Sequence, residues 1–195
     1  MYMNECPADN LTCCSNLSCS TPGEITCIDC EDRNHLSCCG CFLLRHVSLP
    51  FHRILRWTGT SFKQESLYNI GHVIHLNHAG NACPHENTGS GLHSLTVMDT
   101  NGLHTVKIGW CCCADAPEHI DQLLTITLVP ATVIRPMTAF TFRALKLFHM
   151  LTHVARVTPW EFCGTMMRLT DNVDTATLKV RFILNINLKN FDKLC

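Results

Sequence analysis

Cysteine and histidine residues follow one another between positions 27 and 52 at spacings typical of zinc ligands. Six of the cysteines and histidines from Cys27 to His52 follow the pattern C-x2-C-x7-C-x2-C-x4-H-x5-H. A C-x2-C pair on a tight turn places two thiolates beside one ion, and tetrahedral Zn²⁺ takes four sulfur or nitrogen ligands. The spacing therefore predicts metal binding, with six ligands where two sites would need eight.

The missing pair is expected upstream of this segment. We take Cys14 with Cys19 and keep Cys13 as the alternative to Cys14. Because ligand pairs alternate along the chain, they predict two crossed sites. The first holds Cys14, Cys19, Cys38 and Cys41, and the second holds Cys27, Cys30, His46 and His52.

A third metal site is predicted around the run Cys111-Cys112-Cys113, which follows a predicted strand. The period of two in a strand directs Cys111 and Cys113 to one side and Cys112 to the other. A C-x-C pair needs two further donors, and the turn-rich segment before the strands supplies them. The predicted third set is His78, Cys83, Cys111 and Cys113.

The strand before this run belongs to a predicted β-hairpin. The dipeptide Asn101-Gly102 lies between two alternating runs and favours a two-residue type I′ loop. With that loop, apolar partners face each other on one side of the hairpin. The predicted pairs are Val97 with Val106, Leu95 with Ile108, and His93 with Trp110.

Helices are predicted after the hairpin. A short one begins at Ala116-Pro117, and Thr138 is predicted to cap a longer amphipathic one. Thr158 to Glu161 forms a capping box with proline at N1, opening a last helix that is expected to bury Phe162, Met166 and Leu169. The predicted fold class is α+β, with a small zinc-stabilised N-terminal segment followed by a β-hairpin and C-terminal helices.

Fifteen cysteines in 195 residues predict either a disulfide framework or a set of metal sites. The N-terminal residues have neither the basic nor the apolar region of a secretory signal, and no apolar run is long enough to span a bilayer. We therefore expect a protein that is nuclear or cytoplasmic, is not secreted and does not enter a membrane. In such a reducing compartment the cysteines favour metal sites, with Zn²⁺ as the expected cofactor in two or three structural sites.

The net charge of −1 conceals an uneven distribution. Residues 1–32 contain acidic residues but no Lys or Arg, whereas four basic residues lie beside the predicted histidine ligands. They predict weak, salt-sensitive contact with DNA phosphates, and ordinary solvated side chains remain the alternative. The four residues are Arg45, Arg53, Arg56 and Lys63.

Several segments occur in the order found in one protein family. They are WTGTSF, SLYNIGHVIHLNH, the isolated Cys83, TNGLHTVKIGWCCC, QLL, PATVIRPMTAFTFRALKLFHML and RLTDN. From about His46 to Asn172 the chain resembles the second class of CxC-like cysteine cluster domain, found before the catalytic region of fungal KDZ transposases. The resemblance implies a zinc-chelating module for DNA or complex recognition, with transposon ends and other transposase subunits as partners.

The resemblance also places the family's ligand positions on this chain. Its C-x-C corresponds to Cys111 and Cys113, and its Gly-His and Cys positions correspond to His78 and Cys83. This chain has Cys112 where the family usually has glycine within the C-x-C. It also has Asn77 where the family has glycine before the histidine.

The predicted organisation is a zinc-binding segment over 1–52, the CxC-like domain over 53–172 and a divergent tail over 173–195. Family members continue into a catalytic domain with an acidic triad, so the chain is expected to be a truncated copy. Its carboxylates are scattered over turns and helix starts, which predicts no enzymatic activity and no small-molecule substrate. The alternative is a protein-interaction module, because two C-x2-C pairs followed by two histidines also resemble B-box domains.

Overall fold

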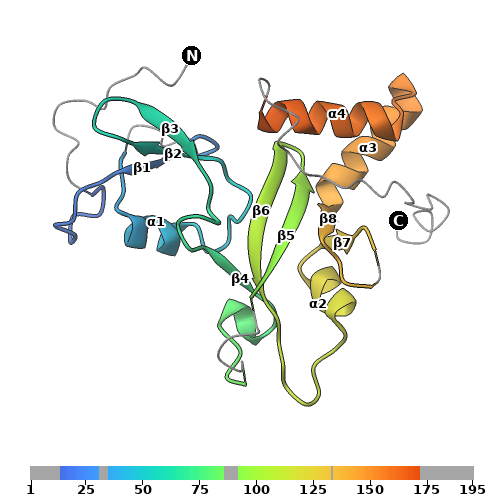
Figure 1. The fold of residues 1–195 in the computed structure, drawn as a ribbon, viewed down its shortest axis with the longest axis horizontal. Coiled ribbons are helices and arrows are strands. Elements are labelled where there is room, and N and C mark those ends of the chain that lie inside the picture. Colours follow the sequence, from blue (N-terminus) through green and yellow to red (C-terminus); the bar gives the residue numbers. More distant parts are fainter. Residues whose placement is uncertain (1–13, 31–34, 86–91, 133, 172–195) are drawn as a thin grey trace. The chain divides into compact units, whose positions relative to one another are not determined.

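The computed structural model describes residues 14–30, 35–85, 92–132 and 134–171 (Figure 1). In these residues four α-helices and eight β-strands form a mixed fold, which confirms the predicted α+β class. The chain divides into two compact units, residues 1–74 and 75–195, and each is described by itself. Cys13 and the predicted tail lie outside the described residues.

The first unit contains a three-stranded antiparallel sheet in the order β1-β2-β3. Its elements are β1 (Ile25–Cys27), α1 (Cys39–Arg45), β2 (Ile54–Trp57) and β3 (Phe62–Glu65). Phe42 of α1 packs with Ile25, Ile54, Leu67 and Ile70 in a small apolar core. The sequence showed no helical period here, because a helix of seven residues spans only two turns and buries one side chain, Phe42.

The pairing of β1 with β2 joins segments on both sides of position 52. Cys27 lies opposite Ile54 in this antiparallel pair, and Trp57 N–H donates to the Glu24 carbonyl at 2.7 Å. The N-terminal ligand-rich segment and the β2–β3 hairpin therefore share one sheet. The domain limits predicted from the sequence stay a prediction.

The second unit is built around a five-stranded sheet in the order β4-β6-β5-β8-β7. β5 pairs antiparallel with β6 and parallel with β8, which pairs antiparallel with β7. The strands are β4 (Val73–His75), which crosses the boundary of the unit, β5 (Leu92–Asp99), β6 (Gly102–Gly109), β7 (Leu128–Pro130) and β8 (Thr138–Thr141). The helical elements are η2 (His78–Gly80), α2 (His119–Thr125), α3 (Phe142–Ala155) and α4 (Pro159–Thr170).

The β5–β6 hairpin forms, but the predicted register is wrong by two residues. Asp99 pairs with Gly102, so the loop is Thr100-Asn101, and Leu95 faces Val106. A type I′ loop would need a positive φ at Asn101, whereas the positive φ of this turn, 131°, occurs at Gly102. Because a shift of two residues preserves the faces, the predicted apolar side chains still share one side of the hairpin.

The start of the long helix is also corrected. Thr138 lies in β8, and α3 begins four residues later with Thr141 as its N-cap, whose hydroxyl accepts from Ala144 N–H. The β8 residues form a strand because β5 and β7 pair with them on both sides, which overrides their local preference. Asp99 at the end of β5 adds to this arrangement, since its buried carboxylate accepts hydrogen bonds from Thr141 and Arg143.

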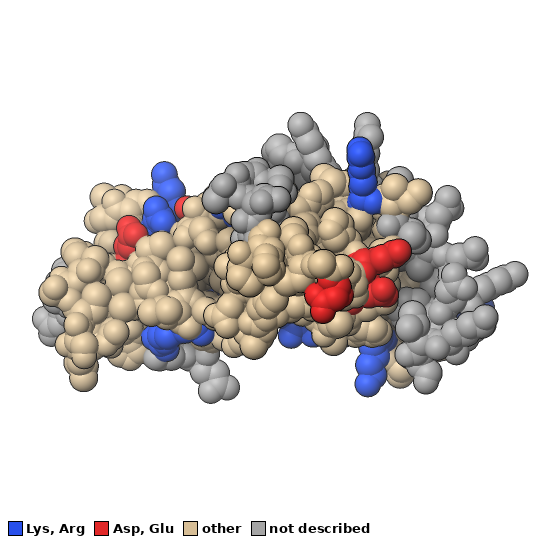
Figure 2. All heavy atoms as spheres, turned by 90° about the horizontal axis from the view of Figure 1, so that it is seen from below, with Lys and Arg blue, Asp and Glu red and all other residues tan. Residues whose placement is uncertain are grey.

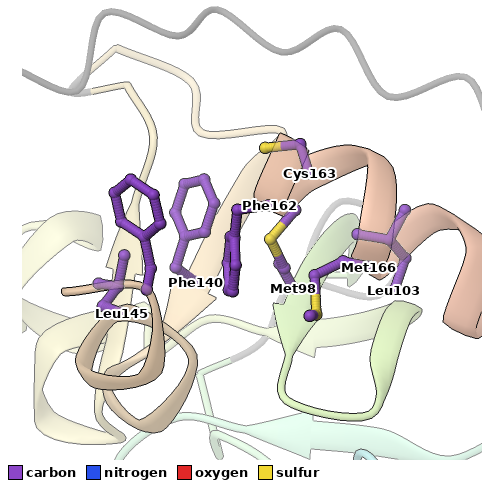
Figure 3. Packing of buried hydrophobic residues seen from close by; sticks show 8 residues of the cluster. Met98, Leu103, Phe140, Leu145, Phe162, Cys163 and Met166 are labelled. Carbon is purple, nitrogen blue, oxygen red and sulfur yellow. The ribbon is translucent and has the colours of Figure 1, made fainter. Parts of the chain in front are cut away.

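Helices α3 and α4 pack on the sheet to form the main core of the second unit. Figure 3 shows Phe140 of β8 beside Phe162 of α4, with Met98 and Met166 continuing the cluster. The predicted capping box at Thr158 and Glu161 is present in full. Phe162 and Met166 are buried as expected, whereas Leu169 is 46% exposed.

None of the helices in the described residues combines the length and the apolar character that crossing a membrane requires.

Candidate metal centres

The structure brings each of the three predicted ligand sets together. Within each set the four ligand atoms, one per residue, all lie within 4.8 Å of one another. Among the described residues, these three sets are the places where three or more potential metal-binding side chains come together, and they contain only cysteine and histidine. We name them site A (Cys14, Cys19, Cys38, Cys41), site B (Cys27, Cys30, His46, His52) and site C (His78, Cys83, Cys111, Cys113).

The spacing of the donor atoms fits a tetrahedral ion. Zn–S bonds of about 2.3 Å and Zn–N bonds of about 2.0 Å give tetrahedral edges of about 3.8 Å between two sulfurs and about 3.5 Å between sulfur and nitrogen. The Sγ atoms of Cys19 and Cys38 lie 3.7 Å apart, and Cys30 Sγ lies 3.5 Å from His46 Nε2. The three sites could therefore each hold one metal ion.

Site A joins the turn after Cys14 to the first turn of α1. Cys38 is the N-cap of α1, and its Sγ accepts from Cys41 N–H at 3.5 Å. Cys14 Sγ in turn accepts from Cys38 N–H at 3.4 Å. Burial works to raise the pKa of the Cys14 thiol, but the hydrogen bond from Cys38 N–H contributes to a net lowering of that pKa, which favours the metal-binding thiolate.

Site A also involves a residue that sequence reasoning missed. The side-chain amide of Asn16 donates to Cys41 Sγ at 3.4 Å. In the sequence Asn16 reads only as part of a glycosylation signal, Asn-Leu-Ser. Its position two residues after a ligand, inside the C-x4-C pair, is the signal that could have identified it.

Site B lies where β1, the end of α1 and the loop before β2 meet. His52 Nδ1 lies 3.3 Å from Cys27 Sγ and 3.4 Å from Cys30 Sγ. His46 donates from Nδ1 to the Phe42 carbonyl at 3.1 Å, which leaves Nε2 as the ligand atom. Burial lowers the pKa of His46, so its imidazole is held in the neutral form that binds metal.

Site C joins η2 and the following loop to the segment after β6. His78 Nε2 lies 3.2 Å from Cys111 Sγ and 3.4 Å from Cys113 Sγ, while the Sγ atoms of Cys83 and Cys113 lie 3.9 Å apart. Cys112 between them is exposed and belongs to none of the three groups. As predicted from the period of a strand, Cys111 and Cys113 converge on the site and Cys112 does not.

An unusual backbone conformation presents His78 to site C. The φ angles of Asn77, His78 and Ala79 are 62°, 46° and 54°, and that of Gly80 is 83°. Three successive non-glycine residues in the left-handed region are costly for L-amino acids. The turn therefore stores strain next to a predicted ligand.

The thiols of site C titrate very differently while no ion is bound. The backbone N–H of Cys112 lowers the pKa of Cys83 to about 6, whereas the neighbouring Cys111 raises the pKa of Cys113 to about 12. Thiols this close cannot all ionise without a cation to balance them. Loading the site therefore requires a cation that displaces protons.

The remaining cysteines of the described residues belong to none of the three sites. All twelve described cysteines are free, so none of them forms a disulfide. Cys39 donates to the Ile70 carbonyl, and Cys163 is buried in the core of the second unit. Burial raises the pKa of Cys163 to about 11, so this thiol stays protonated.

The four predicted DNA-contacting residues have different surroundings. Arg53 forms a bidentate pair with Asp29, with its Nη2 2.6 Å from Oδ1. Arg56 Nε lies 3.9 Å from a carboxylate oxygen of Glu65. The other two are Arg45, which donates to the Ser15 hydroxyl, and Lys63, which lies opposite Arg56 in the β2–β3 pair.

A protein-family model covers the part of the chain that contains site C. It is described as CxC2 like cysteine cluster associated with KDZ transposases, and it matches residues 67–174. The chain belongs to this family. Sites A and B precede the matched CxC2 region, so they add two potential metal centres to it.

Comparison with curated proteins and with solved structures gave no match.

Proposed function

We propose that this CxC2 protein is a zinc-binding accessory module of a KDZ-type transposase, and that it serves DNA or transpososome recognition in the nucleus or cytoplasm. The observation that carries the proposal is the convergence of three closed sets of four Cys and His side chains. Thiolate and imidazole donors in tetrahedral sets favour zinc over the hard cations that carboxylates bind.

The role of the ions in this proposal is structural. Four protein ligands leave no open position for water or a phosphate oxygen, unlike catalytic zinc. Site A joins a loop to α1, and site B joins β1 to the end of α1, so each ion would link segments that lie apart in the sequence. Binding free energies of about 10–16 kcal/mol per ion are large enough to offset the ordering of such loops.

We propose that the chain has no strand-transfer activity of its own. Phosphodiester chemistry of this type uses carboxylates that hold two divalent cations. In the described part of the chain three carboxylates have other partners: Asp29 binds Arg53, Asp99 binds Arg143 and Thr141, and Glu161 belongs to the α4 capping box. This supports binding as the function.

The β2–β3 hairpin is the proposed site of DNA contact. Arg56 and Lys63 are direct cross-strand partners, so their side chains leave the same face of the sheet. On the face shown in Figure 2, the Lys and Arg side chains among the residues drawn in colour occur in small groups. We therefore expect few phosphate contacts and modest affinity.

Fluorescence anisotropy of the zinc-loaded protein with labelled duplex DNA tests this proposal. The affinity should fall steeply with salt, and the double variant Arg56→Gln/Lys63→Gln should reduce the slope of log K against log salt by about 2. Lys146→Gln/Arg168→Gln removes the same charge from exposed positions on α3 and α4 and is the matched control. If both double variants lost the same DNA affinity, net charge alone would explain the effect and the β2–β3 hairpin would not be the contact site.

A protein-interaction module is the second candidate function. The ligands of sites A and B interleave along the chain, which is the crossed arrangement of B-box-type modules. Leu44 and Val47, next to the ligand His46, are 77% and 60% exposed, which is more typical of a protein contact than of a phosphate contact. Binding to a transposase subunit that is insensitive to salt and to loss of Arg56 and Lys63 would favour this candidate.

A further inference from the structure

A glutamine side chain of α2 is completely enclosed next to site C. Gln122 is 1% exposed, although glutamine is normally a surface residue. Its Oε1 accepts from Cys111 N–H at 2.9 Å, and its Nε2 donates to the Cys111 carbonyl at 3.2 Å and to the Pro117 carbonyl at 2.9 Å. The amide is therefore fully used, and two of its three bonds go to one predicted metal ligand.

The position of Cys111 explains what this contact does. β6 ends at Gly109, two residues before Cys111, so the strand pairing that orders the hairpin stops short of the ligand. The primary amide of Gln122 replaces a neighbouring strand, since it offers one acceptor and one donor to the N–H and C=O of a single residue. Fixing both backbone groups also fixes the direction of Cys111 Sγ, which lies 3.2 Å from His78 Nε2.

Helix α2 is itself held against the end of the hairpin. The rings of Trp110 and His119 stack with centroids 4.1 Å apart and an interplanar angle of 20°. Leu123, next to Gln122, is fully buried. Gln122 is thus presented by a packed helix rather than by a mobile loop, which makes its orientation reproducible.

We infer that Gln122 is a positioning residue for site C, which sets the orientation of Cys111 for metal binding. The inference rests on the proposed function, because it takes site C to hold zinc. Replacement of residues that orient metal ligands typically weakens metal binding about tenfold to a hundredfold. The alternative is a purely structural role, in which loss of Gln122 would lower the stability of the second unit without a selective effect on the metal at site C.

The three donor sets allow the sites to be observed separately. Site A offers four sulfurs, site B two sulfurs and two nitrogens, and site C three sulfurs and one nitrogen. Because the cadmium NMR shift depends on the number of thiolate ligands, the full-length protein loaded with cadmium should give three separate signals. Fewer than three donor environments in the wild-type protein would overturn the proposed function and this inference together.

Gln122→Met tests the inference, because methionine is similar in size but cannot form the three hydrogen bonds. The signal of site C should shift or broaden, and zinc at this site should pass to a chelator about tenfold to a hundredfold more readily, with sites A and B unchanged. Gln122→Glu keeps an acceptor for Cys111 N–H but has no donor when ionised, so it should weaken the same site.

Leu123→Val is the matched control, since it reduces buried volume one residue away and keeps the Gln122 side chain that bonds to Cys111. It should lower stability while leaving the relative occupancy of the three sites unchanged. Three unaltered signals in both Gln122 variants would overturn the inference while leaving the proposed function intact. An equally selective loss of metal from site C in Leu123→Val would also overturn the inference, because the occupancy of site C would then depend only on the packing of α2.

Discussion

The left-handed turn that carries His78 gives a prediction in which the same substitution has opposite effects at two nearby positions. Ala79 and Ala82 are both exposed, but Ala79 has φ 54° and ψ 34°, whereas Ala82 does not have a positive φ. A non-glycine residue in the left-handed region costs about 1–2 kcal/mol, and glycine removes this cost. Glycine also increases the entropy of the unfolded chain, which lowers stability by about 0.4–1 kcal/mol at any position.

The two terms oppose each other at Ala79 and leave only the loss at Ala82. We expect Ala79→Gly to raise the free energy of unfolding by about 0.8 kcal/mol and Ala82→Gly to lower it by about 0.7 kcal/mol. Asn77→Gly should be the most stabilising of the three, since Asn77 has φ 62° and ψ −164°, a region that is almost restricted to glycine and costs other residues about 1–3 kcal/mol.

Urea unfolding of the zinc-loaded variants measures these differences, and chelator competition shows whether the affinity of site C changes with them. The informative quantity is the difference between Ala79→Gly and Ala82→Gly, because both remove the same methyl group. If both variants lost stability by the same amount, the left-handed turn and the argument built on it would be wrong.

Three further predictions follow from other parts of the structure. Cys111→Ser should lower the zinc content by one ion, whereas Cys112→Ser should leave it unchanged, as metal analysis of the two variants would show. The reverse result would mean that the assignment of cysteines to site C is wrong. Cys27→Ala should likewise remove the ion of site B and destabilise the first unit, because Cys27 belongs both to site B and to the core of that unit. Full zinc content in this variant would contradict site B. Burial works to raise the pKa of Asp99, but hydrogen bonds from Arg143 and Thr141 outweigh it and lower that pKa. The carboxylate therefore stabilises the fold above its unfolded pKa of about 4, and this effect is lost as the pH falls through the lower pKa of the folded state. Asp99→Asn should therefore cost about 2 kcal/mol at neutral pH, and the difference from wild type in urea unfolding should shrink in acid; a difference independent of pH would argue against the ion pair.

The sequence by itself determined which side chains converge at the three candidate metal centres. A C-x2-C pair restricts two thiolates to one turn, and the C-x-C after a strand directs its cysteines to one side, so local spacing limits the combinations. The capping box at Thr158 and the burial of Phe162 were predictable for the same reason, because the interacting residues lie within one or two helical turns. The family match supports the CxC2 region, whereas bound zinc and DNA contact stay predictions.

Tertiary structure decided the features that depend on partners distant in the chain. Thr138 belongs to a strand because β5, about 40 residues earlier, pairs with it in parallel, and this overrides its preference as a helix cap. The register of the hairpin depends on Gly102, which carries the positive φ of the turn and lies against Thr170 at the end of α4. Gln122 reads as an ordinary surface residue of an amphipathic helix until folding places Cys111 against it. Local spacing brings ligands together, but long-range packing sets the backbone geometry that presents them.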